Sequence, residues 1–179
     1  IMPIKANVPS NGSFTSASLS RALDYAVNNG ADIINMSLAG FGNDSNDPFY
    51  LGTKIQQVID SGVIVVAAMG NFSTSIPMYP AAYPSVIAVG SATLESGTGT
   101  PVKATYSNTG NHIDVVAYTG DTYSARSTYQ RTIACFFESN GCDADESLTV
   151  FSNGTADGTS FATPQVAASV ALLLSRDGN

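Results

Sequence analysis

A serine at the start of a predicted helix is the residue of this sequence best placed for chemistry. The segment Gly158-Thr159-Ser160-Phe161-Ala162-Thr163-Pro164 opens an apolar helix expected over residues 159–175. Asp157 and Thr159 are both suited to cap that helix, so Ser160 is not needed as its cap. The first N–H groups of a helix, with the local dipole, can stabilise an oxyanion. Ser160 is therefore a candidate nucleophile for acyl transfer.

Two other segments follow predicted strands. Ser37-Leu38-Ala39-Gly40 comes after a strand expected at residues 32–37, and Met69-Gly70-Asn71 comes after one expected at residues 63–68. In open parallel sheets, ligands bind beyond the carboxyl ends of the strands. Glycine and asparagine are also common turn residues, so each segment taken singly is interpreted as a turn. Their occurrence together with Ser160 favours a functional site.

The elements that must position these segments alternate between strand and helix. Apolar residues three and four apart predict a first helix around residues 19–27, which Gly30 ends. Asp47-Pro48 marks the start of a second helix, which ends at Gly62. Strands are expected at residues 1–6, 32–37, 63–68 and 86–89, with shorter ones near 103–107 and 113–118. This order implies an α/β fold with a parallel β-sheet and helices packed on it. The last helix is apolar nearly all round, which predicts that it is buried.

These segments together resemble the subtilisin-like serine proteases, the subtilase family. The segment around Ser160 resembles the family's nucleophile motif, and Ala67-Ala68-Met69-Gly70-Asn71 resembles its oxyanion-hole segment. Ile34-Asn35-Met36-Ser37-Leu38-Ala39-Gly40 looks like the substrate-binding strand, and Tyr83-Pro84-Ser85-Val86-Ile87-Ala88-Val89-Gly90 matches a further family segment. The motifs occur in the family's order and cover the chain apart from an insert around 120–150. The resemblance implies that residues 1–179 are a partial peptidase catalytic domain, an N-terminally truncated three-layer sandwich with helices on both faces of the sheet.

The resemblance also implies a role for each matching residue. Ser160 would attack the scissile carbonyl of a peptide or protein substrate, and the Asn71 amide and the Ser160 N–H would hold the oxyanion. The backbone of Ser37, Leu38 and Ala39 would pair with the substrate as an added strand, and Gly70 would also contact the substrate.

Four positions bear on specificity. Ala39 stands where the family often has glycine, and it is expected to narrow the specificity pocket. Met69 replaces a smaller residue, and Gln165 stands where many relatives have histidine. Phe72, just past Asn71, indicates an apolar surface near the pocket.

The other two members of the catalytic triad have no match in this sequence. The family's order is Asp, His, Ser, so the Asp and His are expected upstream of residue 1, and the isolated chain is expected to be inactive. The single histidine, His112, falls in a segment that matches a structural strand. Because His112 and Asp114 share a face if that segment is a strand, a local base for Ser160 is the alternative. A chain cut in this way is expected to associate with the missing N-terminal part or with itself.

The composition is that of a single soluble domain of the kind often exported, although charge alone does not fix the compartment. Apolar residues make up 44% and charged residues 12%, which is enough apolar side chain for a sizeable core. The net charge of −7 without a basic cluster argues against nucleic acid and anionic membranes as partners. No stretch approaches the roughly 18 uninterrupted apolar residues of a membrane helix. With the family resemblance, we expect an extracellular or cell-envelope protein.

Cys135 and Cys142 lie close together in a polar stretch, which favours a disulfide in an oxidising compartment, although two free thiols are the alternative. The chemistry implied by the resemblance requires no cofactor. The family often binds structural calcium, but the acidic runs lack the spacing of an EF-hand loop and are equally well interpreted as solvated loops. These runs are Asp143, Asp145 and Glu146, and Asn43, Asp44 and Asp47.

Three functions fit these observations to different degrees. The leading interpretation is a serine endopeptidase. A non-catalytic peptide-binding module on the same scaffold is the alternative, but such a binder needs neither Ser160 nor Asn71. A doubly wound nucleotide-binding domain is disfavoured, because Gly40-Phe41-Gly42 leads into a polar loop and not into a helix.

Overall fold

The central feature of the computed structural model is a mainly parallel sheet; the structure describes residues 1–8, 12–41, 51–119 and 157–176. Strands β1 (Ile33–Met36), β3 (Ile64–Ala68) and β5 (Ile87–Leu94) run parallel side by side. β7 (Val115–Tyr118) pairs in parallel with the edge of β5 opposite β3, and β6 (Pro101–Lys103) pairs in the antiparallel sense with the last residues of β5. A separate antiparallel pair joins β2 (Gly40–Phe41) to β4 (Met78–Tyr79).

Both faces of β3 are buried, because successive side chains of a strand point to opposite faces. Val65 and Ala67 belong to one hydrophobic cluster, and Val66 belongs to the other. All three side chains are 0% exposed. The continuous β-branched run that predicted a strand covered on both faces therefore has that environment.

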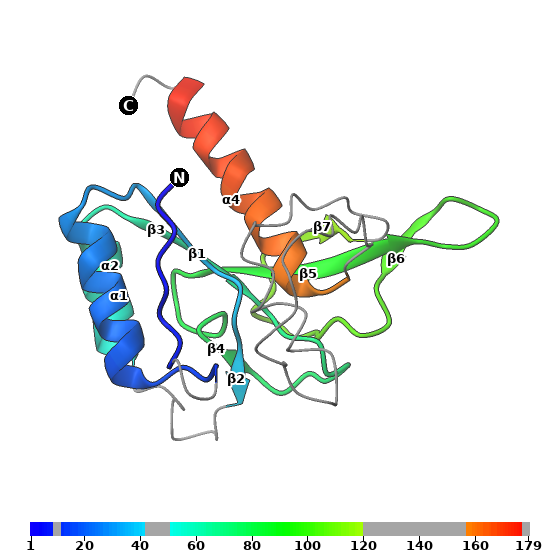
Figure 1. Ribbon diagram of the computed structural model, residues 1–179. Coiled ribbons are helices and arrows are strands. Elements are labelled where there is room, and N and C mark those ends of the chain that lie inside the picture. The colour runs from blue at the N-terminus through cyan, green and yellow to red at the C-terminus, as the bar shows by residue number, and fades with distance from the viewer. Residues whose placement is uncertain (9–11, 42–50, 120–156, 177–179) are drawn as a thin grey trace, which may run out of the picture.

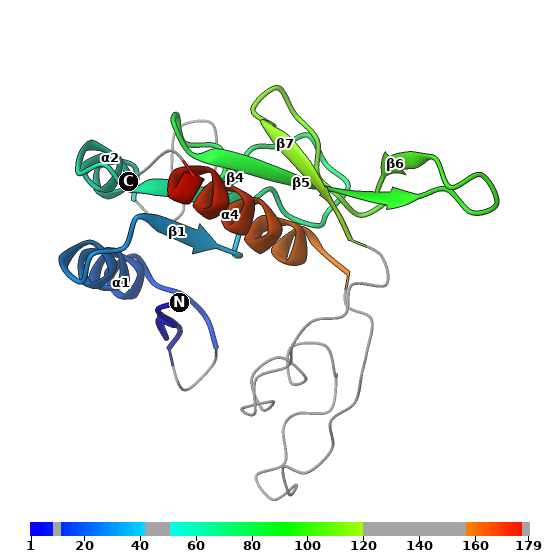
Figure 2. The same cartoon turned by 90° about the horizontal axis from the view of Figure 1, so that it is seen from above.

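Helices cover the two faces of the sheet. α1 (Ser16–Asn28) and α2 (Gly52–Asp60) pack on one face, where Leu19, Leu23 and Ile55 enter the larger cluster. α4 (Thr159–Arg176) lies across β1, β3, β5 and β7 on the other face, as Figures 1 and 2 show. The predicted α/β sheet with helices on both faces is confirmed. Among the described residues, no helix is long and apolar enough to cross a membrane.

Local signals explain where the first helix begins and ends. Thr15 caps α1 in a capping box with Ser18, a start that the apolar spacing alone did not indicate. Gly30 follows with a φ of +76°, as expected for a residue just past a helix.

Three expectations from the sequence are wrong. The strand expected near 103–107 lies earlier, because β6 ends at Lys103 and residues 104–107 belong to no strand. Residues 1–6 are not a strand, because the segment pairs with no neighbour along its backbone. α4 is not buried throughout: Leu172 and Leu173 are 72% and 51% exposed. Its buried residues are Thr159, Ala162 and Thr163 in the first turns, since the sheet covers one side of the helix and the described residues leave the other side exposed.

Several expectations fall outside the described residues. The described part of α2 begins at Gly52, with Leu51 as its N-cap, while the predicted start at Asp47-Pro48 lies outside. The insert expected around 120–150 lies outside as well.

Candidate active site

The first turn of α4 meets the residue that follows β1. The Ser37 hydroxyl donates a hydrogen bond to the Ser160 carbonyl oxygen at 2.8 Å. In return, the Ser160 hydroxyl donates to the Ser37 carbonyl oxygen over a longer 3.3 Å. The structure thus joins the candidate nucleophile to the start of the candidate substrate-binding segment, which lies far away in the sequence.

Pro164 explains why the Ser160 carbonyl is available to Ser37. In an α-helix, the carbonyl of residue i accepts from the N–H of residue i+4, and proline has no N–H to donate. Pro164 lies within α4 four positions after Ser160, so the intrahelical bond to the Ser160 carbonyl is missing. The Ser37 hydroxyl takes its place. The proline of the nucleophile motif therefore has a local structural purpose.

Asn71 is oriented by the residue before the candidate nucleophile. Its Oδ1 accepts hydrogen bonds from the Thr159 N–H and from the Thr159 hydroxyl, both at 2.9 Å. The Thr159 hydroxyl oxygen also accepts from the Gly70 N–H at 3.1 Å. Because Oδ1 is engaged as an acceptor, the Nδ2 group of the exposed Asn71 side chain is the donor left for a ligand.

Gly158 brings this amide close to the nucleophile turn. Its φ is +138°, and an added Cβ would lie 3.1 Å from Asn71 Nδ2. The Gly158 N–H donates to the Tyr106 hydroxyl at 3.0 Å. The missing side chain therefore leaves room for Asn71 beside the residues that lead into Ser160.

The remaining candidate residues lie in the same region. Leu38 and Ala39 are half-buried between β1 and β2, and Leu38 packs against the larger core cluster. Gly70 is buried, and both of its backbone polar groups are bonded: its N–H to Thr159 and its carbonyl oxygen to the Asn108 N–H at 3.0 Å.

Two of the residues that depart from the family pattern, Met69 and Gln165, make their contacts away from Ser160. Met69 is 1% exposed and belongs to the larger core cluster, so its side chain fills the interior. The Gln165 amide donates at 2.9 Å to the carbonyl oxygens of Tyr118 and Phe161, which ties α4 to the end of β7.

His112 and Asp114 do not form a base for Ser160. The Asp114 carboxylate accepts from the Ala88 N–H at 2.8 Å, which attaches it to β5. His112 Nε2 is buried and has no hydrogen-bond partner, and the ring lies against Gly110. Since the hydroxyl of Ser160 donates to Ser37, the local triad is absent from this arrangement.

Thr159 and Tyr106 are the residues of this region that sequence reasoning misses. The sequence predicts only a helix cap at Thr159 and only a place within a short strand for Tyr106. The Tyr106 hydroxyl also bonds to Ser91 and to Thr119, at 3.0 Å and 2.5 Å. No local pattern could reveal these contacts, because each one joins segments far apart in the sequence.

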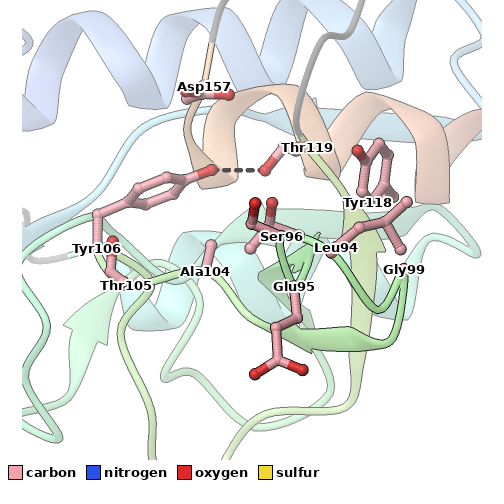
Figure 3. A pocket seen from close by; sticks show the side chains of 12 residues that line it. Leu94, Glu95, Ser96, Gly99, Ala104, Thr105, Tyr106, Tyr118, Thr119 and Asp157 are labelled. Carbon is pink, nitrogen blue, oxygen red and sulfur yellow. Dashed lines mark hydrogen bonds between the residues drawn. The ribbon is translucent and has the colours of Figure 1, made fainter.

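A pocket of about 610 Å³ lies beside Tyr106, between the turn that joins β5 to β6 and the start of α4. Figure 3 shows the Tyr106 hydroxyl directed at Thr119, with Asp157 nearby. Neither Ser160 nor Asn71 lines this pocket. It is therefore separate from the candidate site, which lies at the junction of β1, β3 and α4.

The candidate disulfide and calcium positions are not placed by the structure. Cys135, Cys142 and both acidic runs lie outside the described residues. Within the described ranges, no group of three or more His, Cys, Asp or Glu side chains is gathered as metal ligands would be.

Comparison with known proteins assigns the chain to a class. The model of the subtilase family matches residues 1–179. The chain belongs to the subtilase family of serine proteases, as the resemblance of its motifs indicated.

The relatives show how much of a whole protein the chain spans. It is 32% identical to Subtilisin E of Bacillus subtilis over 171 residues, which are 93% of this chain and 37% of that protein. It is 35% identical to the Minor extracellular protease Epr of the same organism over 178 residues, covering 99% of this chain and 23% of Epr. It thus spans well under two thirds of these relatives.

Solved structures agree with the fold. The prenylagaramide maturation protease PagA is 31% identical with a TM-score of 0.69, over 95% of this chain and 53% of that one. A cold-adapted subtilisin-like serine proteinase is 27% identical with a TM-score of 0.66, over 95% and 52%. The chain therefore corresponds to about half of each structure.

Gly158→Ala is expected to destabilise the chain more than Gly97→Ala. Both glycines have a positive φ, +138° and +86°, so both substitutions carry a backbone cost of about 1–3 kcal/mol. Only at Gly158 would the new Cβ meet Asn71, because Gly97 faces open space. Urea denaturation of the two variants measures the difference, and equal losses would show that Gly158 and Asn71 are not closely packed.

Proposed function

We propose that this chain supplies the nucleophile and the oxyanion hole of a serine endopeptidase. The observation that carries the proposal is the orientation of Asn71: Thr159 holds its Oδ1, and its Nδ2 is left as a donor beside the turn that contains Ser160. A hydrogen-bond donor next to a serine at a helix N-terminus is what acyl transfer requires.

In the proposed reaction, the Ser160 oxygen forms a bond to the scissile carbonyl carbon while its proton passes to a base. The carbonyl oxygen becomes an oxyanion, which Asn71 Nδ2 and the Ser160 N–H stabilise. Collapse of this intermediate breaks the peptide bond, and the amine leaves with the proton. Water then releases the acyl group from Ser160 by the same steps. These steps use protein groups and water, so no cofactor takes part.

The base and its orienting carboxylate are proposed to lie in sequence that precedes residue 1. Two observations support this: Ser160 has no basic partner among the described residues, and the chain covers only about half of the solved relatives. On this proposal, residues 1–179 are a partial catalytic domain and are inactive alone. A non-catalytic peptide-binding module gains no support, because Subtilisin E, Epr and PagA are all proteases.

We propose that the backbone of Ser37, Leu38 and Ala39 receives the peptide substrate, with Gly70 shaping the loop opposite. The reciprocal bonds between Ser37 and Ser160 support this, because they place the start of that segment beside the nucleophile. The side chain of Ala39 would narrow the space available to the substrate.

An exposed pair of aromatic rings supports a preference for large apolar side chains. Phe41 and Phe72 are 46% and 61% exposed, and their ring centroids are 4.8 Å apart. Phe72 directly follows Asn71, and Phe41 lies two positions after Ala39. The pair therefore links the loop that contains Asn71 to the proposed substrate-binding segment at residues 37–39, where an apolar substrate side chain would contact the rings.

Other parts of the proposal concern the environment of the protein. We propose that it acts outside the cell or in the cell envelope, in line with its relative Epr, which is named as extracellular. Structural calcium and a disulfide between Cys135 and Cys142 remain predictions.

Self-association of the isolated chain is also proposed. Among the described residues, β1 pairs on one side only, with β3. Leu172 and Leu173 present apolar surface on α4. An unpaired strand edge and a bare apolar helix face both favour contact with another chain.

Fluorophosphonate labelling tests the proposed chemistry. We expect a longer chain that includes the preceding sequence to be labelled, and Ser160→Ala to abolish that labelling. The chain of residues 1–179 is expected to stay unlabelled for want of a base. Labelling of the short chain at Ser160 would contradict the proposal that the base lies upstream. Absence of labelling in both chains would contradict the proposed serine protease activity.

The aromatic pair is tested by substrate preference in the longer chain. Two peptide substrates are compared, one with Phe and one with Ala before the cleaved bond. Phe41→Ser and Phe72→Ser are each expected to lower the ratio of their kcat/KM values, Phe peptide over Ala peptide, about 10-fold. Ile76→Ser is the matched control, because Ile76 is 53% exposed on the same loop. If the ratio of kcat/KM for the Phe and Ala peptides is unchanged in both Phe variants, the aromatic pair does not determine substrate preference.

Light scattering tests self-association. We expect the mass of the isolated chain to exceed that of a monomer and to fall over about a tenfold dilution, because association depends on concentration. Leu172→Ser with Leu173→Ser should shift the balance toward the monomer. A constant monomeric mass for the unsubstituted chain would refute the proposal.

A further inference from the structure

A buried asparagine lies directly behind residues 69–74, the loop that contains Asn71 and is called here the oxyanion loop. Asn108 follows β6 and precedes β7, and it is 1% exposed. A buried amide is costly unless its donors and acceptor are bonded, so its partners show what the residue is for.

The side chain of Asn108 bonds to the backbone on both sides of Asn71. Its Nδ2 donates to the Met69 carbonyl oxygen at 2.8 Å, before Asn71. Its Oδ1 accepts from the Phe72 N–H at 2.8 Å and from the Thr74 N–H at 3.3 Å, after Asn71. One rigid amide group therefore fixes where this loop enters and leaves the position of Asn71.

The backbone of the same residue adds a further contact. The Asn108 N–H donates to the Gly70 carbonyl oxygen at 3.0 Å. Gly70 has a φ of +96°, and an added Cβ there would lie only 2.7 Å from Asn108 Nδ2. The close approach of Asn108 to the loop thus requires glycine at position 70.

Asn71 is held from two directions as a result. Thr159 holds its side chain from the nucleophile helix, and Asn108 holds its backbone from the opposite side of the loop. An oxyanion donor acts only when it is correctly placed, and a shift of about 1 Å can cost on the order of 10²-fold in rate.

We propose that Asn108 is the positioning residue of the oxyanion hole: it fixes the backbone of residues 69–74 so that the Asn71 amide points at the developing oxyanion. The proposal rests on the proposed protease function. Asn108 itself does not touch the substrate, so its effect must pass through Asn71.

A double-mutant cycle in the longer, labelled chain tests this. Asn71→Ala is expected to lower kcat about 10²–10³-fold, the loss known for subtilisins themselves. We expect Asn108→Ala to lower kcat about 10-fold or more, with KM within about twofold, after active-site titration corrects for unfolded protein. In the Asn71→Ala background, Asn108→Ala is expected to cause no further loss.

Ser107→Ala is the matched control. Ser107 is the preceding residue and is also 1% exposed. Its hydroxyl accepts from the Ser91 N–H on β5 at 3.0 Å and donates to the Asn108 carbonyl oxygen at 3.1 Å. Ser107→Ala therefore removes a contact with the Asn108 backbone but leaves the bonds from the Asn108 side chain to residues 69–74 in place. We expect this variant to lose stability and to keep kcat. If Ser107→Ala lowers kcat as much as Asn108→Ala, the effect is general loosening and the proposal is wrong.

Asn108→Asp keeps the test decisive if Asn108→Ala does not fold. It retains the acceptor for Phe72 and loses the donor to Met69, so a smaller fall in kcat with faster amide exchange in residues 69–74 is expected. An equal loss of kcat from either Asn108 variant with and without Asn71 would overturn the proposal. If Asn71→Ala itself leaves kcat unchanged, the proposed oxyanion hole fails instead.

Discussion

Helix α4 packs across β1, β3 and β5, and the candidate site exists because its first turn meets the carboxyl ends of β1 and β3. The packing is apolar: Ala162 on the helix contacts the cluster that contains Val66 and Val89. It brings Ser160 beside Ser37, and Thr159 beside Asn71. Since apolar contact alone does not set a precise register, the hydrogen bonds at this junction specify how the surfaces meet.

Small and cyclic residues make that junction feasible. Pro164 leaves the Ser160 carbonyl without its helical partner, so Ser37 can bond to it. Gly158 leaves space for Asn71, and Gly70 leaves space for Asn108. Each of these residues removes a group, a side chain or an N–H, where another segment must approach. The nucleophile motif therefore encodes a docking surface in addition to a reactive hydroxyl.

The polar groups of the site form two separate supports. Thr159 controls which atom of the Asn71 amide faces outward, and Asn108 controls where the backbone carries that amide. Tyr106, two positions before Asn108, accepts from the Gly158 N–H, so one short segment after β6 reaches both the nucleophile turn and the oxyanion loop. The segment has no reactive group of its own. It contributes by fixing the positions of the turn before Ser160 and of the loop that contains Asn71.

The helices and strands whose patterns are local could be predicted from the order of the amino acids. The apolar spacing of α1, the β-branched run of β3 and the motif around Ser160 each predicted their structure, because periodicity and capping act within a few residues. Local pattern failed for residues 1–6 and for the outer face of α4, where pairing and burial depend on distant neighbours. Three arrangements became visible only in the folded chain: His112 is separate from Ser160, Thr159 orients Asn71, and Asn108 supports residues 69–74. These contacts join residues far apart in the chain, and their partners are chosen by packing in three dimensions.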